Sequence, residues 1–345
     1  MTDSIYVLSE RELTVEKLHL CTWDVRGGDS FVEVGLSVAN DDALPARAEL
    51  WLVLPFLDGS CTIASLHEQL SDSDTYKFIF NEIPESVQAV DGEKRNGSVV
   101  RLSGEGDARS RTHLVANATA RQEADQPTLV CIGFDRPDAA VGHAYVRLLI
   151  QTRRKTIAEV IPGIAKRSYI FDVKINEARN IPDAVLTFKR DRHLSIVPVL
   201  TAYCLHCVPD NWEISFSDYS KMKNIRRLEK DAFQRYLPLL RKAGGEYIIT
   251  FIKQSDARGS YSFFTTYSRE VVGNQQLFVT VVISLLCNLL IAFSAFRQHL
   301  SADSCWLRQV PTEWWIAVAL IVIGLVICLP VKNWWRRLRN RIWKE

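Results

Sequence analysis

Residues 31–39 read FVEVGLSVA, a run in which every second side chain is apolar. This period of two is typical of a β-strand with one face in a core, and it places Glu33 and Ser37 on the polar face. Turn-forming residues follow at 40–45, and residues 46–54 then alternate in the same way. We therefore predict two strands that are joined by a short turn and paired antiparallel.

Similar short runs lie on both sides of this pair. Residues 6–25 contain one or two, and further strands are predicted at 128–134, 144–152, 169–175, 184–188, 193–208, 212–216 and 247–252. The regular alternation of strands and helices that a parallel α/β fold requires is absent from the pattern. We predict a mainly β fold, an antiparallel β-sandwich, in one or two units.

Charge divides the chain into two parts. Residues 1–146 carry 12 Lys and Arg against 24 Asp and Glu, whereas residues 147–345 carry 30 against 16. We place a boundary between an acidic β-rich unit, residues 1–155, and a basic β-rich unit, residues 156–268. A basic unit suits the negatively charged cytoplasmic leaflet of a membrane, or an anionic small-molecule ligand such as a nucleotide.

One clear helix is predicted within the basic unit, at residues 220–237, where apolar side chains recur at spacings of three and four. Its other faces would be basic, and we expect them to contact an anionic ligand or lipid through Lys221, Lys223, Arg226, Arg227 and Lys230. A merely solvated basic face explains the pattern equally well. Nucleic acid is disfavoured as a partner, because the neighbouring aromatic side chains fall on apolar strand faces and form no exposed stacking surface.

Two apolar stretches lie near the C-terminus. Residues 277–296 (LFVTVVISLLCNLLIAFSAF) and 314–331 (WWIAVALIVIGLVICLPV) contain no charged side chain. At about 1.5 Å per residue, a helix of about 18–20 residues crosses the roughly 30 Å hydrocarbon core of a bilayer. We expect two transmembrane helices that form a hairpin, with a short non-cytoplasmic loop at 297–313.

The tail at residues 332–345 sets the expected orientation, because it is rich in Lys and Arg and such flanks favour the cytoplasmic side. Two spans then place both termini in the cytoplasm, as in a multi-pass protein of the bacterial inner membrane. The side chains expected at the membrane interfaces are Trp314, Trp315, Trp334, Trp335, Arg336 and Arg337. The N-terminus lacks a basic region followed by an apolar core, so no signal peptide is expected.

The first apolar stretch carries a polar face, on which Ser284, Asn288 and Ala292 recur every four residues. An amide in the middle of a span is costly unless it finds a partner, and small neighbours let helices approach closely. We expect this face to pack against the second stretch near Gly324, or against further copies of the chain. The second arrangement would give a homo-oligomer, and in its strongest version a pore.

Cys204, His206 and Cys207 form the sharpest local motif. We interpret it as ordinary packing, since zinc needs a second ligand pair and a redox pair favours the start of a helix; metal binding and redox chemistry are the alternatives. The sequence contains no P-loop, no His-Glu-x-x-His and no Gly-x-Ser-x-Gly motif. We therefore expect no cofactor and lean against an enzyme.

These features predict an integral membrane protein that presents a cytoplasmic β-sandwich for binding or sensing on a two-span hairpin. In the stronger version, binding of a ligand or protein partner drives the hairpins to oligomerise and perturb the membrane. This layout is similar to that of two-span membrane effectors of bacterial defence systems, a likeness without a shared motif. The alternatives are a structural or scaffold subunit of a membrane complex, and a membrane-tethered enzyme.

Overall fold

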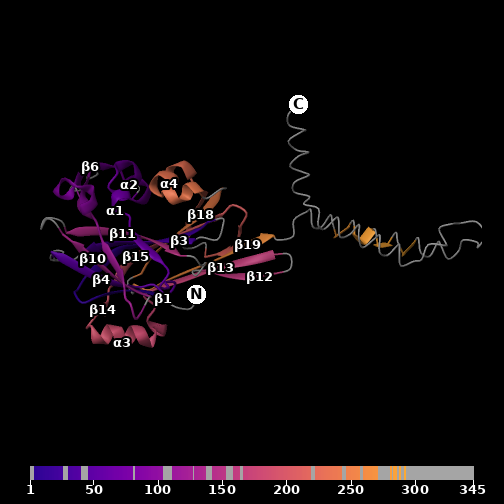
Figure 1. Cartoon of the computed structure of the whole chain (residues 1–345), viewed down its shortest axis with the longest axis horizontal. Helices are drawn as coiled ribbons and strands as arrows, with labels where there is room; N and C mark the ends of the chain where they lie inside the picture. Colours follow the sequence, from indigo (N-terminus) through magenta and orange to yellow (C-terminus); the bar gives the residue numbers. More distant parts are fainter. Residues whose placement is uncertain are drawn as a thin grey trace, which may run out of the picture. The chain divides into compact units, whose positions relative to one another are not determined.

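Two β-sheets make up most of the described chain (Figure 1). The computed structural model describes residues 4–25, 30–39, 46–80, 82–103, 111–126, 128–136, 142–152, 158–163, 166–218, 222–242, 246–256 and 259–270, with single positions between 280 and 292. The strands belong to one compact unit, formed by Met1–Pro162 and Arg167–Arg269. The prediction of a mainly β fold is confirmed, and the two sheets are consistent with a β-sandwich.

The order of strands defines the two sheets. Sheet 1 runs β16 (Glu213–Ser217), β19 (Tyr261–Glu270), β13 (Lys166–Ile175), β1 (Ser4–Ser9), β4 (Arg47–Val53), β10 (Leu129–Asp135) and β9 (Thr119–Gln122), with β12 (Ala158–Pro162) paired to β13 and β14 (Ser195–Ile196) to β1. Sheet 2 runs β17 (Met222–Arg227), β18 (Tyr247–Ser255), β15 (Val199–Pro209), β2 (Thr14–Asp24), β3 (Ser30–Ala39), β11 (His143–Thr152), β8 (Arg111–Ala116), β7 (Gly97–Leu102) and β6 (Pro84–Ala89), with β5 (Thr62–Ser65) paired to β11.

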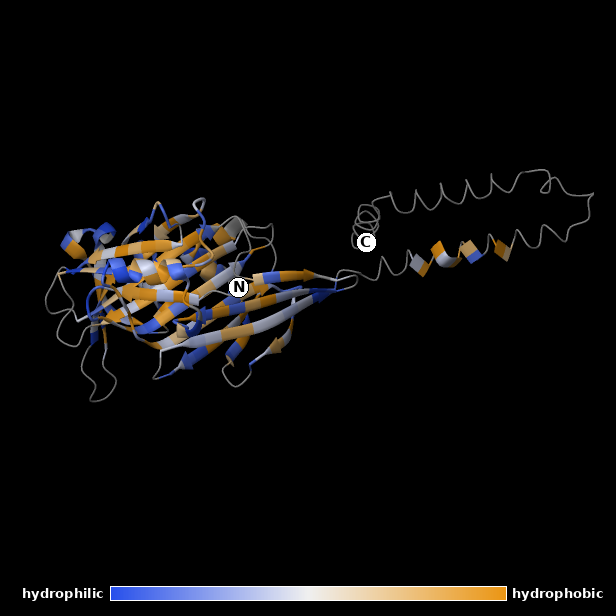
Figure 2. Ribbon diagram, turned by 90° about the horizontal axis from the view of Figure 1, so that it is seen from below, coloured by the Kyte–Doolittle hydropathy of each residue, from blue (hydrophilic) through white to orange (hydrophobic). Residues whose placement is uncertain are grey.

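The main hydrophobic core lies between the sheets. Alternate residues of β3, such as Val34 and Leu36, meet Leu50 and Leu52 of β4 and Phe171 of β13 in one cluster of buried side chains. Figure 2 shows the resulting alternation of hydrophobic and polar residues along the strands. The period of two in the sequence therefore has a direct physical cause, because successive side chains point to opposite faces of a sheet.

Helices cover the outer face of each sheet (Figure 1). α3 (Asp183–Asp191) packs on sheet 1 through Val185 and Phe188, and the Phe188 ring lies 4.9 Å from that of Trp51. On sheet 2, the cover consists of α1 (His67–Leu70), α2 (Ser73–Phe80), α4 (Lys230–Tyr236) and the 3-10 turn η4 (Pro238–Lys242). Three other 3-10 turns are η1 (Val90–Gly92), η2 (Lys94–Asn96) and η3 (Ala178–Asn180).

Strand pairing differs from the prediction in two respects. β3 and β4 lie in different sheets and do not pair with each other, although both bury one face in the same core. The sheets are also mixed, because β1–β13, β2–β15 and β8–β11 are parallel pairs. Alternation reveals which face of a strand is apolar, but it carries no information about the neighbouring strand.

The predicted boundary near residue 155 falls inside the compact unit. β1 pairs with β13, and β2 with β15, so strands from residues 1–155 and 156–268 share both sheets. Met1–Pro162 and Arg167–Arg269 cluster together as one compact unit. The difference in charge between the two parts therefore does not reflect separate folding units.

The predicted strand at 184–188 is wrong, since these residues lie in α3. Pro182 precedes the helix and Asp183 stands in its first turn, where a carboxylate is favourable. Val185 and Phe188, three residues apart, then reach sheet 1 from one side of the helix. The predicted strand at 193–208 is interrupted by Pro198, and it forms β14 and the longer β15.

The basic helix predicted at 220–237 is also wrong in its first half. Residues 222–227 form the edge strand β17, which pairs antiparallel with β18, and only Lys230–Tyr236 is helical. Lys and Arg side chains are common on edge strands, because they oppose pairing with another chain. Here the bonds to β18 outweigh the local preference that the three-to-four spacing suggested.

The C-terminal predictions fall largely on residues beyond the described ones. Within the described part of the chain, no helix is both long and apolar enough to cross a bilayer. Segments 297–313, 314–331 and 332–345 lie outside it, as does most of 277–296. Also outside the described residues are Gly324 of the second apolar stretch and the predicted interface residues Trp314, Trp315, Trp334, Trp335, Arg336 and Arg337. Ser284, Asn288 and Ala292 are described, and all three are helical and exposed.

Candidate functional site

A buried polar network lies on the outer face of sheet 2. At its centre, Glu33 of β3 is 0% exposed and accepts a hydrogen bond from Arg147 Nε of β11 at 2.6 Å. Trp23 Nε1 donates to the other carboxylate oxygen at 2.6 Å, and the hydroxyl of Tyr236 in α4 donates to Glu33 Oε2 at 2.7 Å. The carboxylate thus binds three donors from three elements, which compensates for the loss of water.

The network continues across the sheet to β2. Arg147 Nη1 donates to the Tyr145 hydroxyl at 2.9 Å, and this hydroxyl lies 2.8 Å from His19 Nδ1. Arginine can only donate, so the Tyr145 proton is free to point at His19. Burial, together with the nearby charges of Arg147 and Lys17, lowers the pKa of His19 from 6.5 to about 3. His19 is therefore neutral at physiological pH.

Gly35 of β3 makes room for this network. It lies opposite Arg147 on one side and opposite His19 on the other. A Cβ at this position would stand 2.2 Å from the Tyr145 hydroxyl and 3.1 Å from Arg147 Nη1. The polar face predicted for residues 31–39 is thus real, but α4 covers it and the strand is buried on both faces.

Beyond the helices, the same face of sheet 2 carries an exposed group of aromatic and basic side chains, which we call the aromatic–basic platform: Tyr203, Phe251, Lys223 and Lys253. The rings of Tyr203 in β15 and Phe251 in β18 are partly exposed and stacked, 5.8 Å apart at an angle of 11°. Lys223 Nζ lies 5.5 Å from the Phe251 centroid, and Lys253 Nζ lies 5.6 Å from the Tyr203 centroid. Both lysines are exposed.

The platform and the network meet at His19. The His19 ring packs edge-on against Tyr203 at 4.9 Å, and its Nδ1 binds Tyr145. Lys17, two residues earlier on β2 and exposed, adds a further positive charge at this side. The buried network therefore fixes one edge of the exposed surface.

The structure separates the basic residues that the sequence grouped together. Lys223 belongs to the platform, and Arg226 lies opposite Ile249 of β18 on the same face. Arg227 pairs with Ile248 and, because successive residues of a strand point to opposite faces, lies on the face away from the platform. Its Nη1 lies 3.9 Å from Glu246 Oε2. Lys230 begins α4, and Lys221 lies outside the described residues.

The motif of Cys204, His206 and Cys207 is divided between the two faces of β15. Cys204 belongs to the core between the sheets, whereas Cys207 belongs to the cluster beneath α4. Burial raises the pKa of both thiols, so neither is activated as a nucleophile. Within the described residues, no three His, Cys, Asp or Glu side chains are placed to hold a metal ion.

His206 is stacked at 4.1 Å on Phe171 of sheet 1, and its Nδ1 lies 3.1 Å from the Tyr267 hydroxyl. Its Nε2 has no hydrogen-bond partner among the residues that the structure describes. Burial lowers the pKa of His206 from 6.5 to about 3, so the ring stays neutral in the core. This geometry is that of a packed core histidine.

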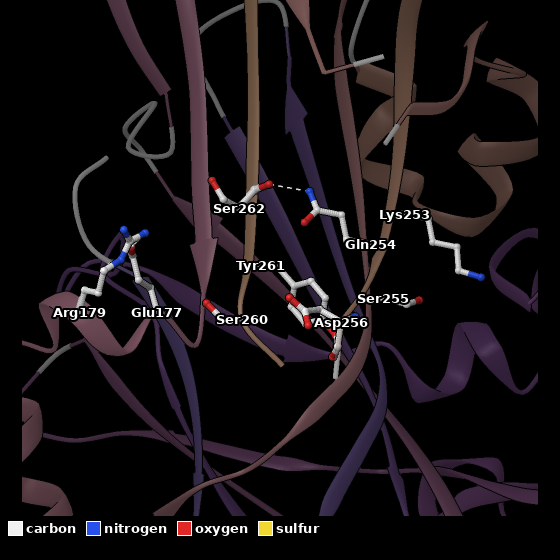
Figure 3. A pocket seen from close by; sticks show the side chains of 9 residues that line it. All are labelled: Glu177, Arg179, Lys253, Gln254, Ser255, Asp256, Ser260, Tyr261 and Ser262. Atoms are coloured by element: carbon white, nitrogen blue, oxygen red, sulfur yellow. Dashed lines mark hydrogen bonds and ion pairs between the residues drawn. The ribbon is translucent and has the colours of Figure 1, made fainter. Parts of the chain in front are cut away.

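A separate open pocket of about 480 Å³ lies between the end of β18 and the start of β19 (Figure 3). Its lining is polar and balanced in charge: Glu177, Arg179, Lys253, Gln254, Ser255, Asp256, Ser260, Tyr261 and Ser262. Arg179 is already paired with Glu177 at 2.6 Å, and Lys253 points away from the other side chains (Figure 3). The pocket lacks the apolar walls typical of a small-molecule site.

Sequence reasoning missed the network and the aromatic half of the platform. The available signal was Arg147, a charged residue inside the otherwise uncharged run AYVRLLI. Such a residue needs a buried partner, but the sequence does not indicate which of many acids it is. No protein-family model matches the chain, and no curated protein does.

Proposed function

We propose that this chain is an integral membrane protein whose β-sandwich binds an anionic ligand on the aromatic–basic platform. The observation that carries the proposal is the pair of exposed lysines, Lys223 and Lys253, placed over two partly exposed rings. Cations held over aromatic faces form a surface that attracts anions and offers apolar contact beside them. The neighbouring Lys17 and Arg226 extend the positive charge.

The membrane part of the proposal rests on the sequence. The charge-free stretches 277–296 and 314–331 are each long enough to span a bilayer, and the basic tail at 332–345 favours cytoplasmic termini. Retention of the full-length chain in the membrane pellet after alkaline carbonate treatment is the expected result. A chain that ends at residue 270 should be released. Release of the full-length chain would overturn the membrane assignment.

Ligand binding is tested with inorganic triphosphate as the probe, by calorimetry on the detergent-extracted protein. Lys223→Gln and Lys253→Gln should each weaken binding by about tenfold, since a hydrogen bond to a charged group is worth about 1.5–3 kcal/mol. Lys77→Gln is the matched control, because Lys77 is an exposed lysine on α2 that pairs with Asp74. Equal affinity in all three variants would refute the site.

The second step of the proposal is that binding drives the hairpins to assemble. The helical positions Ser284, Asn288 and Ala292 share one face at a spacing of four, which supports a packing surface for another helix. The expected result is a defined homo-oligomer of the full-length protein and a monomer of residues 1–270. If the full-length protein is a monomer both with and without triphosphate, the hairpin only anchors the chain in the membrane.

A further inference from the structure

We infer that the ligand of the aromatic–basic platform is a nucleotide, whose base stacks on the Tyr203–Phe251 pair while its phosphates face Lys223 and Lys253. This inference rests on the proposed function and names the chemical class of its ligand. A simple anion would need only the lysines, whereas the arrangement also supplies aromatic surface at the same place.

The two rings lie on adjacent strands, with their planes nearly parallel and their centroids 5.8 Å apart. Tyr203 lies opposite Lys253, and Phe251 lies opposite Leu205, so the rings are diagonal neighbours on one face of sheet 2. Their planes differ by only 11°, which lets one planar group lie against either ring without a change of tilt. Stacking of a base on such a ring strengthens binding by about tenfold or more.

The position of the lysines suits a charged group attached to a stacked ring. Lys223 comes from the edge strand β17 and Lys253 from β18, so the two ammonium groups approach from different strands. A lysine binds phosphate as a point charge, and it needs no fixed fork geometry. The Lys223 ammonium group lies 5.5 Å from the centre of the Phe251 ring, and that of Lys253 lies 5.6 Å from the centre of the Tyr203 ring.

The surface is held ready by the interior. His19 contacts Tyr203 edge-on, and the bonds from His19 through Tyr145 and Arg147 end at the buried Glu33. A surface that is ordered before binding loses less conformational entropy on binding. The contact with His19 therefore holds the Tyr203 ring in place before a ligand stacks on it.

A second exposed aromatic pair provides a contrast within the same molecule. Phe216 of β16 and Phe264 of β19 lie on sheet 1 with ring centroids 5.9 Å apart, but their planes meet at 62°. They form an edge-to-face pair, whereas the planes of Tyr203 and Phe251 are nearly parallel. This pair is a suitable control, since its rings are aromatic and even more exposed than those of the platform but meet edge to face.

The experiment measures the affinity of full-length protein in detergent for ATP, GTP and inorganic triphosphate. We expect both nucleotides to bind about tenfold more tightly than triphosphate, and within a few-fold of each other, because stacking tolerates every base. Phe251→Leu should remove most of this advantage, so that ATP, GTP and triphosphate bind with similar affinities. Phe264→Leu should leave this advantage unchanged, and the unfolding midpoint of each variant reports that it is folded.

Each outcome separates the two proposals. If triphosphate binds and depends on Lys223 and Lys253, but nucleotides bind no more tightly, the nucleotide inference fails and the anion site stands. Absence of binding by all three probes would overturn the anion site itself. A ten-nucleotide thymidine strand that binds more than about tenfold tighter than ATP would also overturn the inference, since the surface would then accept a polymer.

Discussion

Removal of one partner of the buried pair between Glu33 and Arg147 should destabilise the β-sandwich about as much as removal of both. The two side chains are 0% and 3% exposed, and their atoms lie 2.6 Å apart. Arg147→Met leaves the carboxylate buried with Trp23 and Tyr236 as its donors, which should cost about 3–5 kcal/mol of the free energy of unfolding. Glu33→Leu leaves the guanidinium buried and should cost a similar amount.

The double variant contains no buried charge. Its expected cost is about 2–6 kcal/mol, because Trp23 and Tyr236 each lose one acceptor at about 1–3 kcal/mol. The sum of the single effects is about 6–10 kcal/mol, so the coupling energy between the two positions should be about 4 kcal/mol at the centres of these ranges. Both values are large against a total stability of about 5–15 kcal/mol.

Urea unfolding of residues 1–270, followed by tryptophan fluorescence, measures these free energies, and Trp23 reports directly on the network. Lys77→Met is the matched control, since it removes an exposed ion pair with Asp74 and should cost less than about 1 kcal/mol. Additive effects of Glu33→Leu and Arg147→Met, or a loss below about 1 kcal/mol for either, would refute the argument that the pair is a single buried unit.

Three further predictions use the same preparations. Gly35→Ala should cost about 1–3 kcal/mol of unfolding free energy, because its methyl group would overlap the network, whereas Gly142→Ala, with open space around its Cβ, should be nearly neutral. The pKa of His19 and of His206 is lowered by burial to about 3, so the unfolded state takes up protons below pH 6.5 and the folded state does not. Stability is therefore complete above pH 6.5 and falls as the pH drops toward 3, by about 2 kcal/mol per histidine between pH 7 and pH 5, and His206→Phe should remove one of these two contributions. Asn288→Ala should reduce the native mass of the full-length protein in detergent, and an unchanged oligomer would exclude this residue from the assembly contact.

Local pattern was enough to locate most strands but not their partners. Residues 31–39, 128–134 and 144–152 all form strands as predicted, because alternation reports burial of one face. The pairing of β1 with β13 joins residues about 170 positions apart, which no local pattern encodes. For the same reason, the single unit and the mixed sheets could not be derived from the sequence.

The two wrong elements show where local preference loses to tertiary contact. Residues 184–188 alternate like a strand, but Pro182 and Asp183 start a helix that buries Phe188 against Trp51. Residues 222–227 have helical spacing, but their backbone pairs along one side with β18, with a register shift between Met222 and Asn224. In both cases the contact that sets the secondary structure comes from residues outside the local segment.

The sequence alone determined that the chain is mainly β and that its C-terminal part carries two long apolar stretches, because periodicity and composition are local properties. The sequence also grouped Lys223 with other basic residues as a predicted contact for an anionic ligand or lipid. Only the tertiary structure brought Lys253, Tyr203 and Phe251 beside it, and only the tertiary structure buried Glu33 with Arg147. These groups come from strands far apart in the chain, and their meeting depends on sheet order, which is set by the energy of the whole core.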